Sequence, residues 1–204
     1  MALVSVATLK AYLPEITGSS ADTELTNMIN RTESAIARYL DFPIADSGTT
    51  PVLTEQTYTL YLDGPMNDDP SVLASPIRPL VSVTSVHSDP NLVYDSSSSI
   101  GSAEYVIDKQ LGRLILKPLT ATSSFDVGYR NIKLVCVAGY SASNPPDDLV
   151  HAICVWCSQL QRGKANQGKD SITVRDSTVK ISKRTIPEEV KQLIQPLRNY
   201  GSIL

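Results

Sequence analysis

The sequence contains few of the residues and motifs that commonly carry catalysis. Its 204 residues include only two histidines, His87 and His151. No glycine-rich phosphate loop is present, and no serine lies in a Gly-x-Ser-x-Gly turn. The adjacent carboxylates Asp147–Asp148 and Glu188–Glu189 would point apart on a helix, and their positions suit the positive ends of helix dipoles. We therefore expect a protein that is not an enzyme and that needs no cofactor.

Cysteine is also scarce, which argues against a disulfide-bonded scaffold. The three cysteines, Cys136, Cys154 and Cys157, leave at least one thiol unpaired, so a reducing compartment with buried thiols is the favoured interpretation. His151, Cys154 and Cys157 are spaced three residues apart and could roughly share one helix face. Zinc usually takes cysteine pairs from tight loops and needs a fourth ligand. Core packing of these residues is therefore favoured over a metal site.

Long apolar runs are missing. No segment approaches the roughly 18–20 apolar residues that cross a bilayer, so no membrane partner is expected. The first residues, Met-Ala-Leu-Val-Ser-Val, do not form a basic region followed by an apolar one. The sequence therefore predicts no secretory signal.

The residues that are present predict a folded core with an uneven charge. Apolar residues make up 42% of the chain and charged residues 19%, which is typical of one or two globular domains. Residues 1–160 carry 9 Lys/Arg and 17 Asp/Glu, whereas residues 161–204 carry 9 and 4. A basic end on an acidic body suggests a charged partner, either an acidic protein surface or nucleic acid.

Helical patterns occupy both ends of the chain. Ser5 is a good N-cap for a short helix that ends before Pro14. Asp22 is predicted to cap a longer amphipathic helix to Leu40. Its apolar stripe comprises Leu25, Met28, Ile29, Thr32, Ile36, Tyr39 and Leu40, and Asn27, Asn30, Arg31, Glu33, Ser34 and Arg38 are assigned to the polar side. A third helix is expected over 146–162, and Pro187 opens a fourth.

The middle of the chain has the alternation of β-strands. Strands are predicted at 57–62, 80–86 and 132–138, and a hairpin joins 105–107 to 113–116. The apolar run 132–138 suggests burial on both faces. A second short hairpin is predicted over 172–181.

These patterns predict an α+β fold. The N- and C-terminal segments form a helical bundle, with a central antiparallel β-rich insertion and a short C-terminal hairpin. Two parts are expected: a helical body from 1–45 and 141–204, and a β-rich insertion over 52–140.

Two stretches of the basic end are candidate contact sites. The loop 162–169 carries Arg162, Lys164 and Lys169, which could contact DNA phosphates or a neighbouring subunit, although it has no aromatic residues for stacking. The last helix is interrupted at Pro196, so its apolar residues cannot all face one core. The candidate partner-binding residues are Val190, Leu193, Ile194, Pro196, Leu197, Arg198 and Tyr200.

The order of these segments resembles the head–tail connector, or adaptor, proteins of long-tailed double-stranded DNA bacteriophages. The resemblance lies in the opening 4–13, the helix 22–40, the β segments 79–83 and 135–140, and the helix start 145–149. The final element, 186–198, resembles the ending of that family, with Leu197 in place of the usual aromatic residue.

The resemblance implies a structural neck protein located in the virion, between capsid and tail, and assembled in the host bacterial cytoplasm. It implies self-association into a ring of twelve copies, with the C-terminal segment docked on the portal protein. The opposite face would receive a stopper or tail-completion protein, and genomic DNA would pass through the lumen without sequence recognition. Truncation after Thr185 is expected to leave a folded protein that no longer joins portal-bearing heads.

Two other interpretations remain open from the sequence. One is a tail-terminator or stopper-type neck protein; such proteins are mostly β-barrels, so the amphipathic helices argue against it. The other is a metal- or thiol-dependent hydrolase centred on His151, Cys154 and Cys157.

Overall fold

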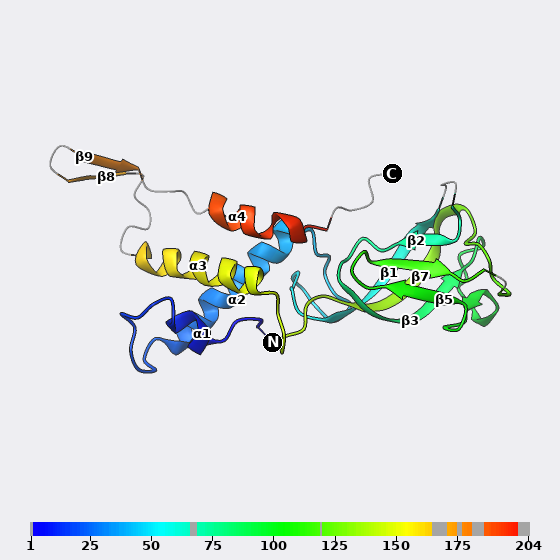
Figure 1. Ribbon diagram of the computed structural model, residues 1–204, viewed down its shortest axis with the longest axis horizontal. Coiled ribbons are helices and arrows are strands. Elements are labelled where there is room, and N and C mark those ends of the chain that lie inside the picture. The colour runs from blue at the N-terminus through cyan, green and yellow to red at the C-terminus, as the bar shows by residue number, and fades with distance from the viewer. Residues whose placement is uncertain are drawn as a thin grey trace.

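The computed structural model describes residues 2–65, 69–118, 120–164, 171–174, 177–180 and 186–199. Helices and antiparallel sheets are both present, so the predicted α+β class is confirmed. The described part is elongated: helices lie at one end and the main sheets at the other (Figure 1). Among the described residues, no helix has the length and apolarity needed to cross a membrane.

Within the described residues, four α-helices form the helical end. They are α1 Val6–Lys10, α2 Asp22–Tyr39, α3 Asp147–Arg162 and α4 Glu188–Ile194, which continues as the 3-10 helix η3 Gln195–Leu197. Helix α3 contacts α1, α2 and α4, and its buried face includes Leu149, Ile153 and Trp156. The predicted amphipathic pattern thus places α3 at the centre of the helical core.

The two N-terminal helices begin differently from each other. Ser5 is the N-cap of α1, and its hydroxyl accepts a hydrogen bond from the Thr8 N–H at 3.1 Å, as predicted. The prediction that Asp22 caps α2 is wrong, because Ala21 is the N-cap and has no side-chain capping bond. Asp22 is instead the first helical residue and forms an ion pair with Lys10. A carboxylate in this first turn still stabilises the helix through its dipole.

Glu33 is the clearest departure from the predicted polar side of α2. It is buried, and its Oε1 accepts hydrogen bonds from the N–H groups of Leu3, at 2.8 Å, and Val4, at 3.1 Å. The N-terminal segment therefore lies over a position that the helix pattern alone assigns to solvent.

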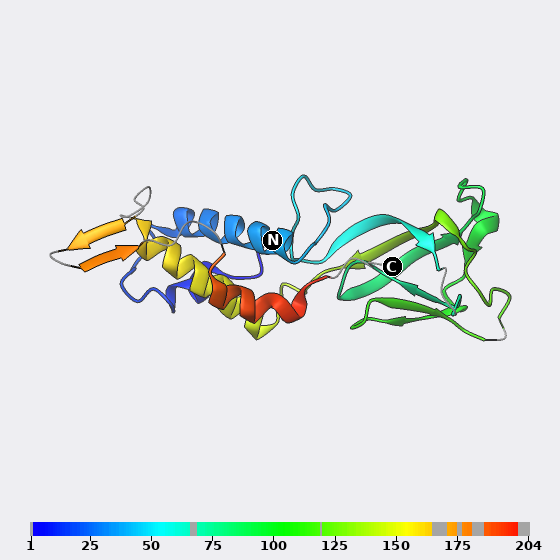
Figure 2. The same cartoon turned by 90° about the horizontal axis from the view of Figure 1, so that it is seen from above.

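The other end of the molecule contains two sheets. Strands β1 Gln56–Gly64, β7 Gly128–Ala138, β3 Leu80–Ser88 and β4 Ser99–Ile100 form one sheet in that order. Strands β2 Val72–Ala74, β6 Arg113–Leu116 and β5 Tyr105–Asp108 form the other, which lies beside it as a second layer (Figure 2). The predicted β5–β6 hairpin is confirmed, and Gly112 supplies the positive φ (+62°) that its turn requires.

Burial along β7 alternates, so the prediction that both of its faces are buried is wrong. Ile132, Leu134, Cys136 and Ala138 are buried, whereas Lys133, Val135 and Val137 between them are half-exposed. Antiparallel sheets commonly cover one face only. The apolar outward residues made this run indistinguishable from a doubly buried strand in the sequence.

The connection from α2 to β1 and the connection from β7 to α3 join the helices to the sheets, and backbone hydrogen bonds link the two connections. Tyr140 N–H donates to the Leu53 carbonyl at 2.8 Å, and Glu55 N–H donates to the Tyr140 carbonyl at 3.1 Å. The Phe42 and Tyr140 rings lie 6.1 Å apart beside this contact. Strand β8 Ser171–Val174 pairs antiparallel with β9 Ser177–Lys180 beyond the far end of α3 (Figures 1 and 2).

Candidate interaction surfaces

The predicted partner-binding segment lies against the chain's own body. Val190 and Ile194 are fully buried in the helical core, and Leu193 and Leu197 are partly buried against it. Pro196 is exposed, and Tyr200 lies outside the described residues. Val190 and Ile194, two of the seven candidate partner-binding residues, are therefore inaccessible to a partner while α4 stays packed.

The end of this segment, Arg198 and Asn199, forms polar contacts with both the helical end and the β end of the molecule. Arg198 Nε lies 2.8 Å from Asp41 Oδ2, and its guanidinium lies 5.6 Å from the centre of the Tyr39 ring. Asn199, which is fully buried, donates its N–H to the Leu40 carbonyl and accepts from Arg78 N–H at 2.9 Å. These bonds give Arg198 and Asn199 a structural role at the junction.

The burial of α4 changes what a truncation would do. Loss of residues 186–204 would remove the fully buried Val190 and Ile194. Replacing a single buried aliphatic side chain by alanine lowers the free energy of unfolding by about 2–5 kcal/mol. The expectation that the chain truncated after Thr185 stays folded is therefore untenable. Truncation after Asn199 keeps every described contact of α4.

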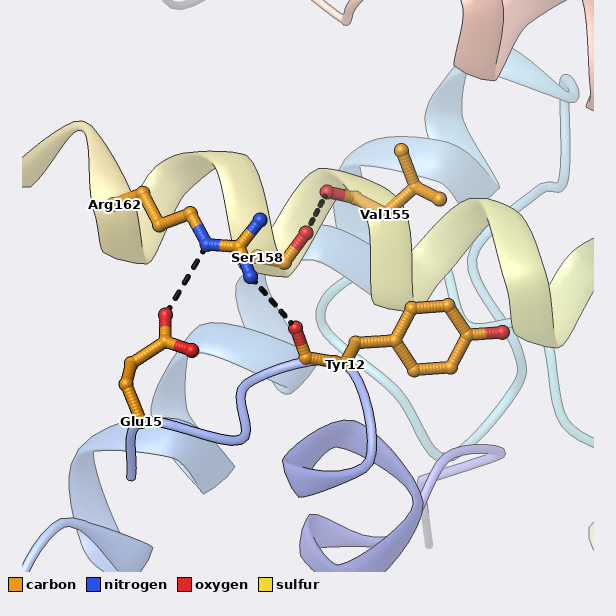
Figure 3. Close-up of polar contacts among 5 residues, drawn as sticks. All are labelled: Tyr12, Glu15, Val155, Ser158 and Arg162. Atoms are coloured by element: carbon orange, nitrogen blue, oxygen red, sulfur yellow. Dashed lines mark hydrogen bonds and ion pairs between the residues drawn. The ribbon is translucent and has the colours of Figure 1, made fainter.

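The basic residues at the end of α3 are used within the chain. Arg162 donates from Nε to Glu15 Oε1 and from Nη2 to the Tyr12 carbonyl, both at 3.1 Å (Figure 3). One turn earlier, the Ser158 hydroxyl donates to the Val155 carbonyl at 2.8 Å. Lys164 is ion-paired with Glu24, and Lys169 lies outside the described residues. Arg162 and Lys164 thus hold the loop after α1 and the start of α2 against α3.

The histidine and cysteines of α3 do not assemble into a reactive site. His151 is exposed and its Nδ1 lies 3.0 Å from the Tyr12 hydroxyl, whereas Cys154 and Cys157 are buried. Burial raises the pKa of the Cys154 thiol to about 12 and that of Cys157 to about 11. Cys157 Sγ also lies 3.4 Å from Thr32 Oγ1. Among the described residues, no group of three or more His, Cys, Asp or Glu side chains could hold a metal ion.

An aromatic cluster, with Tyr61 exposed and Tyr94 half-buried, lies on the β end, and no pattern in the sequence predicted it. The Tyr61 and Tyr94 rings are 5.5 Å apart; the guanidinium of Arg130 lies 5.4 Å from the first ring and Lys133 Nζ lies 5.8 Å from the second. Tyr129, beside Arg130, is 77% exposed. Exposed aromatic residues with arginine are typical of protein–protein contacts.

The backbone around this aromatic cluster adopts unusual conformations. Leu92, Tyr94 and Arg130 have φ between 53° and 62° without being glycine. Asp89 supports the first of these turns, because its Oδ2 accepts from the N–H groups of Val93 and Tyr94. Hydrogen bonding to the backbone of Tyr94 and Asn91 lowers the pKa of Asp89. Strained residues of this kind concentrate at binding sites, and Val93 and Val127 beside them are 67% and 61% exposed.

Comparison with known proteins gives a fold but no family assignment. No family model matches the chain, and no curated protein matches it. Among solved structures, it matches a chain in the neck of an empty gene transfer agent (GTA) particle computed with C6 symmetry. That match has a TM-score of 0.56 and 16% identity, and covers 97% of this chain and 90% of the other.

Two further structures agree with this match. A chain from the virion of a native GTA particle has a TM-score of 0.55 at 17% identity, covering 97% of this chain and 90% of that one. A chain from the neck of a native GTA particle computed with C12 symmetry has a TM-score of 0.54 at 14% identity, with 98% and 94% covered. The resemblance to neck proteins that the sequence predicts is thereby confirmed at the level of the fold.

Proposed function

We propose that this chain is a structural subunit of a phage-type neck, a head–tail adaptor that forms a ring between the portal protein and the tail. The observation that carries the proposal is the match over 97–98% of the chain to chains of GTA necks and virions. Two of the matched structures were computed with sixfold and twelvefold symmetry, which is compatible with a ring of twelve copies. On this proposal the protein has no catalytic step and resides in the virion, between capsid and tail.

The proposed organisation follows the predicted parts of the chain. Residues 1–45 and 141–204 form the helical adaptor body, and 52–140 form the β-rich insertion. The portal would contact the exposed side of the C-terminal segment and the residues beyond Asn199, because Val190 and Ile194 are occupied inside the subunit. The stopper or tail-completion protein would contact another face, for which the aromatic cluster around Tyr61, Tyr94 and Tyr129 is the best-suited surface.

The two alternatives explain less of the molecule. Stopper and tail-terminator proteins are mostly β-barrels, so that assignment does not account for the helical core of α1–α4. A thiol-dependent hydrolase would need a nucleophile that ionises near neutral pH, and burial holds the pKa of both α3 thiols far above that range.

Assembly on portal-bearing heads tests the proposal. Full-length protein should form rings in negative-stain images when mixed with portal, and it should restore attachment of tails to heads that lack it. The chain truncated after Asn199 should keep its unfolding temperature but bind portal more weakly. The proposal is wrong if full-length protein neither forms rings nor joins heads. Normal portal binding by the truncated chain would refute only the C-terminal contact.

A further inference from the structure

The outward face of α2 is entirely polar. Figure 2 shows α2 along one edge of the helical end, with α4 along the other edge. The exposed positions on this face are Thr23, Glu24, Asn27, Asn30, Arg31 and Arg38, with Ser34 half-buried among them, and Glu24 is ion-paired with Lys164. Residues separated by three, four and seven positions share a helix face, so these side chains form one stripe. It contains no apolar residue, whereas the buried side of α2 carries Leu25, Ile29 and Ile36.

Arg31 and Arg38 differ from the other cations of the helical end. Among the described residues, Lys10, Arg162, Lys164, Lys191 and Arg198 each form an ion pair with a carboxylate. Within the described part of the chain, the side chains of Arg31 and Arg38 make no ion pair and no hydrogen bond. The two residues begin about 10 Å apart along the helix axis, given seven residues at a rise of about 1.5 Å each, and both side chains are exposed.

A hollow lies between these arginines. It has a volume of about 310 Å³ and is lined by Asn30, Arg31, Ser34 and Arg38. The Ser34 Oγ is shielded from solvent and has no hydrogen-bond partner within the described residues. Because this hydroxyl is shielded, a ligand in the hollow would contact the exposed side chains of Asn30, Arg31 and Arg38 and not the Ser34 oxygen.

The functional groups on the stripe indicate which class of ligand it could bind. Guanidinium, amide and hydroxyl groups are the side chains that contact phosphate oxygens in nucleic-acid complexes. A protein partner would require apolar or aromatic residues at the centre of its contact, and this face has none. A single charged stripe without base-reading aromatic residues suits sequence-independent contact with a phosphate backbone.

We propose that the stripe Asn27–Asn30–Arg31–Ser34–Arg38 is a phosphodiester-binding surface that contacts double-stranded DNA without reading its sequence. The inference rests on the proposed neck function, in which every copy of a ring would carry this surface and the genome would pass through the ring. It moves the expected DNA contact from the loop 162–169, where Arg162 and Lys164 are paired with Glu15 and Glu24, to α2.

Fluorescence anisotropy with a short labelled duplex tests the proposal on the full-length chain. Wild-type protein should bind with an affinity that falls as salt rises. The R31Q/R38Q variant should bind about tenfold more weakly at low salt, and the salt dependence should decrease by about one counterion for each arginine removed. The variant K109Q/R113Q is the matched control, because it removes the same charge from exposed positions on the β5–β6 hairpin; it should bind like wild type.

The other outcomes separate this proposal from the neck function. If wild-type protein shows no salt-dependent binding, or if R31Q/R38Q binds like K109Q/R113Q, the DNA surface is refuted while ring formation with portal can still succeed. If R31Q/R38Q abolishes ring formation but leaves binding of duplex unchanged, the stripe is a contact between copies instead. If inorganic phosphate and unlabelled duplex compete equally well at the same phosphate concentration, the stripe is an anion site with no preference for DNA. That result would also refute the proposed DNA-binding surface.

Discussion

The carboxylate of Glu33, in the middle of α2, accepts a hydrogen bond from the backbone N–H of Leu3 at 2.8 Å. A second bond to the same oxygen comes from the neighbouring amide at 3.1 Å. Because the carboxylate is buried, it satisfies two donors that no water would reach, and it ties the start of the chain to the second helix. This contact fixes the N-terminal segment over the helical core.

Replacing Glu33 tests this role. Glu33→Ala should lower the free energy of unfolding by about 1–3 kcal/mol, because two buried amides lose their acceptor. Glu33→Gln keeps an acceptor oxygen and should be milder. Urea denaturation measures both, and Asn27→Gln on the exposed side of the same helix is a control expected within about 0.5 kcal/mol of wild type. An unchanged stability of Glu33→Ala would contradict the tethering role.

The same residue should give the stability a pH dependence. Burial raises the pKa of Glu33 above the ordinary value of 4.5, despite the opposing hydrogen bonds. The folded chain then holds this proton at a pH where the unfolded chain has lost it, so the free energy of unfolding falls as pH rises from about 4.5 through the raised pKa. Glu33→Gln has no such proton and should flatten this part of the curve. Denaturation midpoints across weakly acidic pH give the comparison.

The cysteines should react slowly in the folded protein. All three are buried, and burial raises the pKa of Cys136 to about 12, as it does for the α3 thiols. The thiolate is the reactive form, so an alkylating reagent at pH 8 should label the native chain slowly and the urea-unfolded chain fully. Mass spectrometry counts the labels. Rapid native labelling of Cys154 or Cys157 would revive the thiol-dependent alternative, and elemental analysis for zinc would test its metal form.

The junction between helices and sheets depends on a glycine. Gly139 has φ +119°, and a Cβ there would lie 2.6 Å from the Thr54 carbonyl oxygen. Gly139→Ala should therefore cost about 2–4 kcal/mol, from backbone strain and a clash that cannot relax easily. Gly18→Ala is the matched control: its φ is also positive, +74°, but nothing lies within 4 Å of the added carbon. Thermal unfolding should show a clearly smaller loss for the control, about 1 kcal/mol.

The aromatic cluster should matter for assembly and not for folding. Tyr129→Ser with Val127→Ser should leave stability within about 0.5 kcal/mol, because both side chains are mostly exposed. Addition of the stopper or tail-completion protein to adaptor-bearing heads should be impaired. Val106→Ser with Leu111→Ser removes two apolar groups that are about half exposed, 52% and 48%, from β5 and from the turn that follows it, and should have no effect. Impairment by both pairs alike would show that general surface hydrophobicity matters and that the aromatic cluster has no special role.

The sequence by itself determined the α+β class and the order of the longer elements, but it did not predict the short strands β2 and β4. The hydrophobic periodicity, together with the helix-boundary residues Ser5, Pro14 and Pro187 and the turn residue Gly112, was enough to predict the helices and the β5–β6 hairpin. Caps, turns and amphipathic stripes depend on neighbours close in the chain. The order of these segments also sufficed for the resemblance to neck proteins, since a fold is specified by its pattern even where few residues are shared.

Only the tertiary structure decided which face of each element is covered, and by what. Glu33 looked solvent-facing until residues 2–4 were placed over it, and β7 looked doubly buried until one face of its sheet proved open. Arg162 and Arg38 looked alike as exposed cations, yet one is paired with Glu15 and the other with no described residue. Contacts between segments far apart in the chain, 30 residues for Glu33 with Leu3 and 147 for Arg162 with Glu15, leave no local pattern. Those contacts separate the structural charges from the ones left for a partner.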